Sequence, residues 1–518
     1  MAFERRSRVG ISPTALAGIL LIIGLVIGFL VGWAAKPAAP AEVRTVTQTQ
    51  TVTQTVTAGA PGAATVTVTQ TQTATKTLTQ RVTETVTAAG AVGTIKIKVW
   101  ASGSPVDVTR VDNVERAADI LNRMFSSAGL GVKIVVEKQF FRGDYMDKLT
   151  AAFAAGEAPD IIAMKNLPAL VDGGYVIALD DYIAKYKDLL QDVYPVLWNS
   201  VKYKGKIWAL PQDTEARPLY FRKDVLKKLG WSEDEINALP EKIRSGEVTM
   251  LDLIKVAKEA VSKGLVQWGF YHRPNFGAQP FVIFYYQYGG ILQDPDTGKL
   301  VLVKSAMLKS LELLYKMAQV DKVLPPEMIG TSWRQIHSDF VNGRVLFWLG
   351  GTWHWAEWQR VAYHETLGKL PEDYEWENMG FALVPAPEPG LKPLTLSSPY
   401  LYYVTSQSKY PELAFLLILL ATSTPLDAKH AVDSAHLPVR MTTVDHPYYT
   451  ESRFHTEVAY MLKYTTFEPL HPKFSAYKDA WITAITKVEK GELTPDKALD
   501  EMVTVLKSEI GDELIIKE

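Results

Sequence analysis

The chain has 518 residues, of which 47% are hydrophobic and 22% charged, and its net charge is −2. This length can bury a large core and predicts more than one compact unit. The near-neutral charge gives no indication of a nucleic-acid partner. There is no cysteine, which excludes disulfides, thiolate metal sites, thiol catalysis and a lipid-modified cysteine anchor.

A membrane anchor is expected near the start of the chain. Residues 9–35 carry no charge, contain an apolar stretch long enough to cross a bilayer, and follow a cluster of arginines. The positive-inside tendency predicts that residues 1–10 are cytoplasmic, that 11–35 form a transmembrane anchor, and that the rest is extracellular. Two alternatives stay open, namely a secretory signal removed after Ala35 and an archaeal pilin-type signal cut after Gly10.

A stalk is expected at residues 36–93, where the composition changes to threonine, valine, glutamine and alanine. Threonine occupies every odd position from 45 to 57 and again from 65 to 79. Such a segment cannot bury a core of its own. It is expected to be either an O-glycosylated stalk or an unmodified disordered linker, with a strand-rich stalk as the third alternative.

The globular part begins with alternating strand and helix patterns. The hydrophobic periodicity predicts a strand at 94–100, a helix at 107–125, a strand at 132–137, a helix at 144–155 and a strand at 160–163. This order predicts a parallel α/β layer with right-handed crossovers, in which ligands bind beyond the carboxyl ends of the strands. The candidate residues on that rim are Trp100, Ser102, Ser104, Phe141, Met164, Lys165 and Asn166.

The segment 340–358 holds four of the thirteen tryptophans. Its pattern predicts a strand from Arg344 to Leu349, a break at two glycines, and a helix capped by Thr352. The tryptophans within the helix, Trp355 and Trp358, are expected to pack inward. At the mouth of the helix, Trp353 is a candidate platform for a ligand, and His354 is a candidate hydrogen-bonding neighbour or a satisfied interfacial histidine.

The apolar run Leu413–Ala421 is only nine residues long. It is therefore predicted to be a buried helix that packs against the first part of the globular region, and not a second membrane span.

No catalytic, metal or cofactor motif is complete in the sequence. Asp213 and Glu215 lie two residues apart on an extended segment, and we expect their side chains to point to opposite faces, which would make them a poor acid pair. Glu215 is expected either to contact a ligand or to form a structural salt bridge with Arg217. No cofactor and no metal are therefore expected.

Several motifs together resemble the extracellular solute-binding proteins of ABC importers, in the sugar-binding group typified by maltose-binding protein. They occur in family order at residues 145–162, 173–181, 203–211, 211–224, 340–353, 437–440 and 491–499. The resemblance implies an α/β fold of two lobes, of the type II periplasmic-binding-protein class, that closes around its ligand by hinge bending. The implied lobe 1 is residues 94–212 plus 385–440, and the implied lobe 2 is residues 213–384 plus 441–518.

The resemblance also assigns roles to particular residues. Glu215 matches the family's cleft carboxylate, Trp353 a sugar-stacking tryptophan, and Phe276 roughly matches another aromatic platform. Where maltose binders tend to carry a late tryptophan, this chain offers Tyr477 or Lys478, which is a departure that questions maltodextrin as the ligand. Further ligand contacts are expected from Asp213, Arg217 and Tyr400.

The resemblance implies that the protein is a membrane-tethered receptor that binds a sugar or oligosaccharide and delivers it to the permease subunits of an ABC importer. It is expected to catalyse no reaction of this ligand. The alternatives within this class are a peptide binder and a binder of a glycoside phosphate or glycerol-phosphate ester. From other classes, a surface glycosidase and a stalked structural component of the envelope stay open.

Overall fold

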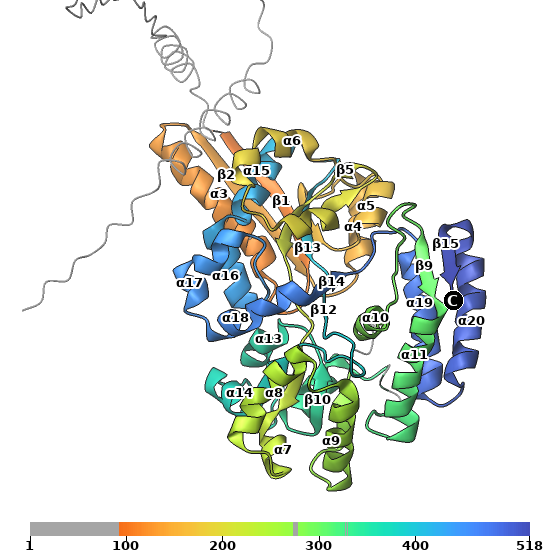
Figure 1. Cartoon of the computed structure of the whole chain (residues 1–518). Coiled ribbons are helices and arrows are strands. Elements are labelled where there is room, and N and C mark those ends of the chain that lie inside the picture. Colours follow the sequence, from red (N-terminus) through yellow and green to blue (C-terminus); the bar gives the residue numbers. More distant parts are fainter. Residues whose placement is uncertain (1–92, 273–277, 327, 329) are drawn as a thin grey trace, which may run out of the picture. The chain divides into compact units, whose positions relative to one another are not determined.

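The structure of the protein is a computed structural model that describes residues 93–518 except 273–277, 327 and 329 (Figure 1). The expected anchor, the expected stalk and Phe276 lie outside the described residues. The described chain forms two compact units. One contains residues 93–96 and 118–135, and the other contains residues 97–117 and 136–518.

The first sheet has five strands in the order β2-β1-β3-β13-β6. Its strands are β1 (Gly93–Ser102), β2 (Val132–Phe141), β3 (Ile161–Met164), β6 (Leu210–Asp213) and β13 (Tyr400–Val404). Helices α3 (Thr109–Ser127) and α4 (Tyr145–Ala155) separate the first three strands along the chain. β1 runs parallel to β3, whereas β13 runs antiparallel to both β3 and β6. The predicted strand and helix order is confirmed, with an antiparallel strand added from late in the chain.

The second sheet has four strands in the order β11-β7-β10-β8. They are β7 (Leu219–Arg222), β8 (Trp268–Tyr271), β10 (Val345–Leu349) and β11 (Met379–Ala382). β10 pairs in parallel with β8 and antiparallel with β7. Every residue of β10 is buried, as its uninterrupted apolar run predicts for a strand covered on both faces.

The chain passes between the two sheets more than once. It leaves the first sheet at the end of β6 and enters the second at β7, with only five residues between the two strands. It returns from β11 through β12 (Thr395–Ser397) to β13. β12 pairs in parallel with β14 (Thr465–Phe467), so a third segment lies beside the returning one. These connecting segments bring residues that are distant in sequence to one place.

The other described helices, in chain order, are α5 (Leu167–Asp172), α6 (Asp180–Lys185), α7 (Lys223–Lys228), α8 (Glu233–Ser245), α9 (Met250–Ser262), α10 (Ala278–Gln287), α11 (Lys304–Tyr315), α12 (Trp333–Val341), α13 (His354–Arg360), α14 (Glu372–Asn378), α15 (Pro411–Ala421), α16 (Thr424–Ser434), α17 (Pro447–Thr450), α18 (Arg453–Val458), α19 (Phe474–Glu489) and α20 (Pro495–Ile510). Short strands pair as β4 (Lys202–Tyr203) with β5 (Lys206–Ile207) and as β9 (Leu300–Val303) with β15 (Leu514–Lys517). Figure 1 shows α11, α19 and α20 side by side, in agreement with their mutual contacts.

Helix α15 is apolar over almost its whole length and is buried. It packs against β13 of the first sheet, as expected for the run Leu413–Ala421. Among the described residues no single helix is long and apolar enough to cross a membrane. By length and composition alone, the pair α15 and α16, bent by 63°, passes such a test together.

The strand–turn–helix prediction for the tryptophan-rich segment is confirmed except for its cap. Trp355 and Trp358 are buried, as expected. The residue that precedes α13 is Trp353, and the hydroxyl of Thr352 makes no hydrogen bond within the described chain. The physical reason is that the strand-like pairing continues into the turn, where the backbone N–H of Thr352 donates to the carbonyl of Ala216.

Candidate functional site

An ionic cluster forms where the chain leaves the first sheet. Asp213, the last residue of β6, is fully buried, and its Oδ2 accepts hydrogen bonds from Arg110 Nη2 at 2.7 Å and from His430 Nε2 at 2.9 Å. Its Oδ1 accepts from the backbone N–H of Tyr400 at 3.3 Å. Burial alone would raise the pKa of Asp213, but Arg110, His436 and His430 hold it well below its ordinary value. Asp213 is therefore ionised and occupied by protein partners.

Glu215 lies two residues further and bridges two basic side chains. Its Oε1 is 2.6 Å from Arg217 Nη2 and 3.1 Å from Lys165 Nζ. Although burial opposes ionisation, Lys165 and Arg217 lower the pKa of Glu215 below its ordinary value. The structural salt bridge expected between Glu215 and Arg217 is therefore present, and it also contains Lys165 from the end of β3.

Arg217 is the residue whose hydrogen-bonding capacity is least used. It is 4% exposed, and only its Nη2 donates within the site. Its Nε and Nη1 are buried and have no hydrogen-bond partner among the described residues. Burial lowers the pKa of Arg217, while Glu215 and Glu468 oppose that decrease. A buried guanidinium with unused N–H groups is costly unless another molecule satisfies them.

Trp353 lies directly against this guanidinium. The Cζ of Arg217 is 4.6 Å from the centre of the indole. The imidazole of His436 stacks on Trp353, with 5.5 Å between the ring centres and an angle of 11° between the ring planes. Only 8% of Trp353 is exposed. The residue thus lies in the cluster, as the sequence suggests. His436 and Arg217 therefore both contact the indole.

His436 links the two halves of the cluster. Arg110 Nη2 lies 3.4 Å from its Nε2, while its Nδ1 is 3.0 Å from Ser434 Oγ and 3.5 Å from Asp107 Oδ1. Because arginine can only donate, the proton of a neutral His436 belongs on Nδ1. Burial lowers the pKa of His436 below its ordinary value, which favours the neutral ring.

The prediction that Asp213 and Glu215 point to opposite faces is wrong. Both carboxylates lie near the same ring, because Glu215 Oε2 is 3.9 Å from His436 Nε2, and Asp213 has a carboxylate oxygen within 4.8 Å of a nitrogen of that ring. The reason is that only neighbouring residues of an extended segment point to opposite faces, whereas Asp213 and Glu215 are two residues apart and therefore point to the same face.

Aromatic residues of the first sheet border the cluster. Tyr400 lies under two cations, with Arg110 Cζ 3.5 Å and Lys165 Nζ 5.1 Å from its ring centre. Trp100 and Phe141, at the ends of β1 and β2, pack together with ring centres 5.1 Å apart. Lys165 of the predicted rim and Tyr400, which was expected as a further ligand contact, therefore join the ionic cluster directly.

The remaining predicted residues lie in varied surroundings. The carbonyl of Ser102 accepts from Arg110 Nη1, and Ser104 Oγ is buried without a hydrogen-bond partner in the described part of the chain. Asn166 is exposed in a left-handed conformation before α5. His354 is buried and stacks on Trp348. Tyr477 is fully buried, and its hydroxyl donates to the carbonyl of Val301, so the structure does not bring it to the cluster.

Sequence reasoning missed several members of the cluster. Arg110 and Asp107 belong to a segment that resembles an ordinary amphipathic helix, and His430 lies inside another helix. His436 directly precedes the motif Leu437–Arg440, which was a usable signal. Glu468 follows β14, and its Oε1 lies 3.7 Å from Lys478 Nζ. Lys478 therefore enters the site as part of an ion pair.

Two groups of side chains have spacings that resemble a metal site, namely Asp213, His430 and His436, and His337, His354 and Glu357. In the first group, the positive charge of Arg110 lies 2.7 Å from the carboxylate oxygen, which opposes a divalent cation. In the second, His337 Nδ1 accepts the indole N–H of Trp358, which places the imidazole proton on Nε2, the nitrogen facing Glu357. Both arrangements are those of protein hydrogen-bond networks.

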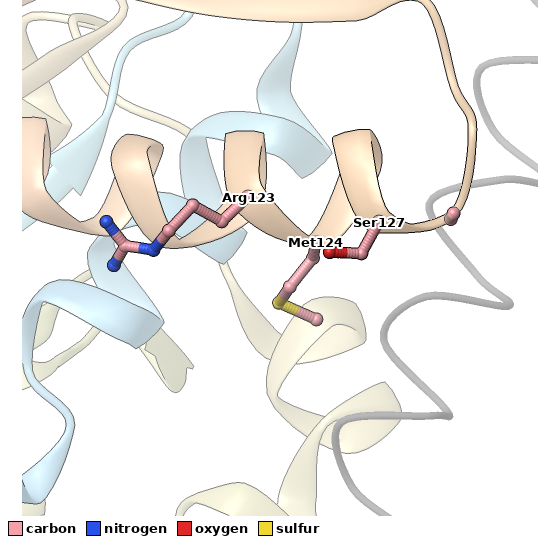
Figure 2. A pocket seen from close by; sticks show the side chains of 4 residues that line it. Arg123, Met124 and Ser127 are labelled. Carbon is pink, nitrogen blue, oxygen red and sulfur yellow. The ribbon is translucent and has the colours of Figure 1, made fainter.

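A surface depression on α3 lies outside this cluster. Figure 2 shows Arg123, Met124 and Ser127 along one face of the helix, and Ala128 completes the lining. Arg123, Ser127 and Ala128 are exposed. The depression has no buried polar group to orient a ligand, so it is a weaker candidate than the ionic cluster.

Comparison with known proteins agrees with the motifs. The family model described as bacterial extracellular solute-binding protein matches residues 117–425, more than half of the chain. A maltotriose-binding protein of Pyrococcus abyssi is 25% identical over 158 residues, which are 30% of this chain and 32% of that protein. The chain thus aligns with about a third of that curated relative's length.

Solved structures share the fold. The maltose-bound T. maritima MalE3 has a TM-score of 0.63 and 19% identity, and the match covers 80% of this chain and 100% of that one. The sugar-binding protein MalE of Xanthomonas citri has a TM-score of 0.64 and 18% identity, covering 80% and 97%. The resemblance to extracellular solute-binding proteins is confirmed by the family model. The chain therefore belongs to the bacterial extracellular solute-binding protein family and has its two-lobe α/β fold.

Proposed function

We propose that this protein binds a neutral sugar or oligosaccharide, of maltodextrin type, beside Arg217 and Trp353. It delivers this ligand to the permease subunits of an ABC importer. The observation that carries the proposal is the buried guanidinium of Arg217, which has unused N–H groups and lies against an indole. A sugar offers hydroxyl oxygens that accept from the guanidinium and an apolar ring face that packs on the indole.

The charge of the cluster favours a neutral ligand over a phosphate ester. Four basic side chains are matched by four acidic ones, and the members are Arg110, Lys165, Arg217 and Lys478 with Asp107, Asp213, Glu215 and Glu468. An anionic ligand would leave an unbalanced charge in a buried site. A glycerol-phosphate ester and a peptide with charged termini are therefore the weaker alternatives.

The ligands of the relatives support the same class. The protein of Pyrococcus abyssi is named for maltotriose, and the T. maritima protein holds maltose. The T. maritima protein shares the fold of this chain, and the cluster described here offers groups that suit a saccharide.

We propose no catalytic step. Lys165 and Arg217 lower the pKa of Glu215, and Arg110, His436 and His430 lower that of Asp213, so each carboxylate lacks the proton that a general acid must donate. A surface glycosidase is the competing class. Release of nitrophenol from nitrophenyl glycosides by the purified chain would favour that class.

The cell-surface location is part of the proposal. Extracellular family membership and the apolar residues 11–35 support a single-pass protein with its globular part outside the cell, joined to the anchor by the threonine-rich residues 36–93, either O-glycosylated or unmodified. For the lobes, we propose residues 94–212 plus 385–440 and residues 213–384 plus 441–518.

Titration calorimetry with maltotriose tests the ligand site. Arg217→Lys keeps the positive charge beside Glu215 but removes the unused guanidinium donors. We expect it to weaken maltotriose binding about tenfold or more, since a hydrogen bond to a charged group contributes roughly 1.5–3 kcal/mol. Arg123→Lys, at an exposed position on α3, is the matched control and should bind like the unmodified protein. Equal affinities for all three proteins would show that Arg217 does not contact the ligand.

A further inference from the structure

Glu468 is held close to Arg217 by the segments that connect the two sheets. The hydroxyl of Thr395 in β12 accepts from the backbone N–H of Arg217 at 2.6 Å and is 3.2 Å from its carbonyl oxygen. β12 pairs with β14, in which Thr465 lies opposite Thr395, and Glu468 is the residue that directly follows β14. Residues 217 and 468 are thus attached to neighbouring strands.

The two side chains carry complementary groups that do not satisfy each other. Glu468 Oε1 is buried without a hydrogen bond in the described structure, as are Nε and Nη1 of Arg217. The carboxylate of Glu468 is near enough to oppose the decrease that burial causes in the pKa of Arg217. Lys478 Nζ is 3.7 Å from Glu468 Oε1, which is an ion pair but is too long for a hydrogen bond.

The chemistry of these two groups selects the ligand. Arg217 needs an acceptor, whereas Glu468 needs a donor. A hydroxyl group can act as acceptor and donor at once, because its oxygen accepts a hydrogen bond from the guanidinium while its O–H donates one to the carboxylate. A phosphate or carboxylate ligand would satisfy Arg217 but would be repelled by Glu468. An ammonium group would satisfy Glu468 but would be repelled by Arg217.

We propose that Glu468 is a ligand-binding and specificity-determining residue. Its Oε1 accepts hydrogen bonds from saccharide hydroxyl groups whose oxygen atoms accept from Arg217 Nε or Nη1. Lys478 keeps the carboxylate in place. This assignment rests on the proposed function and adds to it a residue from the C-terminal part of the chain, which selects for neutral, polyhydroxylated ligands.

The test is titration of the full chain with maltotriose, comparing the unmodified protein with Glu468→Gln, Glu468→Ala and Glu492→Gln. Glu492 is an exposed glutamate in the turn between α19 and α20, so its variant is the matched control. We expect both Glu468 variants to bind about tenfold or more weakly, as loss of a hydrogen bond to a charged group implies. Glu492→Gln should bind normally.

A thermal unfolding series separates binding from a merely structural role. Without maltotriose, Glu468→Gln should unfold at the same midpoint as the unmodified protein, and only the increase caused by maltotriose should shrink. An equal loss of midpoint with and without the sugar would overturn the assignment, as would normal affinity of Glu468→Ala. If the unmodified protein does not bind maltotriose or any other saccharide, the proposed function itself is wrong. This result is distinct from a failure of the Glu468 assignment alone, in which the unmodified protein and both Glu468 variants would bind equally well.

Discussion

At the scale of single residues, Glu375 is a buried carboxyl group that should be uncharged at neutral pH. Its Oε2 accepts from Gln359 Nε2 at 2.8 Å, and its Oε1 has no hydrogen-bond partner in the described chain. Burial raises the pKa of Glu375 to about 9. Between the unfolded value of about 4.5 and this value, the native state binds the extra proton, so Glu375 makes the protein less stable as pH rises.

We therefore expect Glu375→Gln to stabilise the protein at pH 8 by about 1–3 kcal/mol, since the amide keeps the acceptor for Gln359 and cannot ionise. The gain should vanish by about pH 4, where the glutamate is protonated in both states. Urea unfolding at the two pH values measures it. Glu377→Gln, on the exposed side of α14, is the control. A gain of equal size at both pH values would contradict the assigned charge state.

Which site residues could be foreseen depends on how far apart their partners lie in the sequence. Glu215, Arg217 and Lys165 were foreseen from a motif and from strand ends. His436 and Glu468 were not, because their roles come from contacts with segments up to some hundreds of residues away, such as the stacking on Trp353. No local pattern encodes such a contact.

At the scale of elements, the turn between β10 and α13 positions Trp353. A Cβ added at Gly351 would lie 2.1 Å from the Cη2 and Cζ3 atoms of the Trp353 indole. Gly351→Ala should therefore displace the ring, destabilise the protein by about 1–3 kcal/mol and weaken maltotriose binding. Chemical unfolding and calorimetry measure the two effects. Gly143→Ala, where a Cβ would meet nothing within 4 Å, should change neither. An unaffected Gly351→Ala protein would mean that the indole is not held as described.

Most helices and strands of the first sheet were predictable from the sequence, whereas the residue that caps α13 was not. Strand and helix periodicity gave β1, α3, β2, α4 and β3 in the correct order because their apolar positions are regular. Thr352 was expected to cap α13, and this is wrong because its backbone is held by the carbonyl of Ala216. A preference for caps is weak compared with pairing to a neighbouring segment.

At the scale of the whole molecule, the order of the motifs predicted the two-lobe fold. The candidate site was harder to predict because residues from several separate segments meet there: Arg110, Lys165, Glu215, Trp353, His436 and Glu468. Each segment satisfies its own local structure, and only the way the chain passes between the two sheets brings them together. Fold therefore follows from periodicity and motif order, while the ligand site depends on the topology.

We propose that this cluster binds a neutral saccharide. Titration calorimetry of the full chain with maltotriose, glycerol 3-phosphate and an unmodified tripeptide tests it most directly. We expect maltotriose to bind with a dissociation constant in the micromolar range or tighter, corresponding to a binding free energy of about 8 kcal/mol or more, and at least about 100-fold more tightly than the other two compounds. Tighter binding of the phosphate ester or the peptide than of the sugar would contradict it.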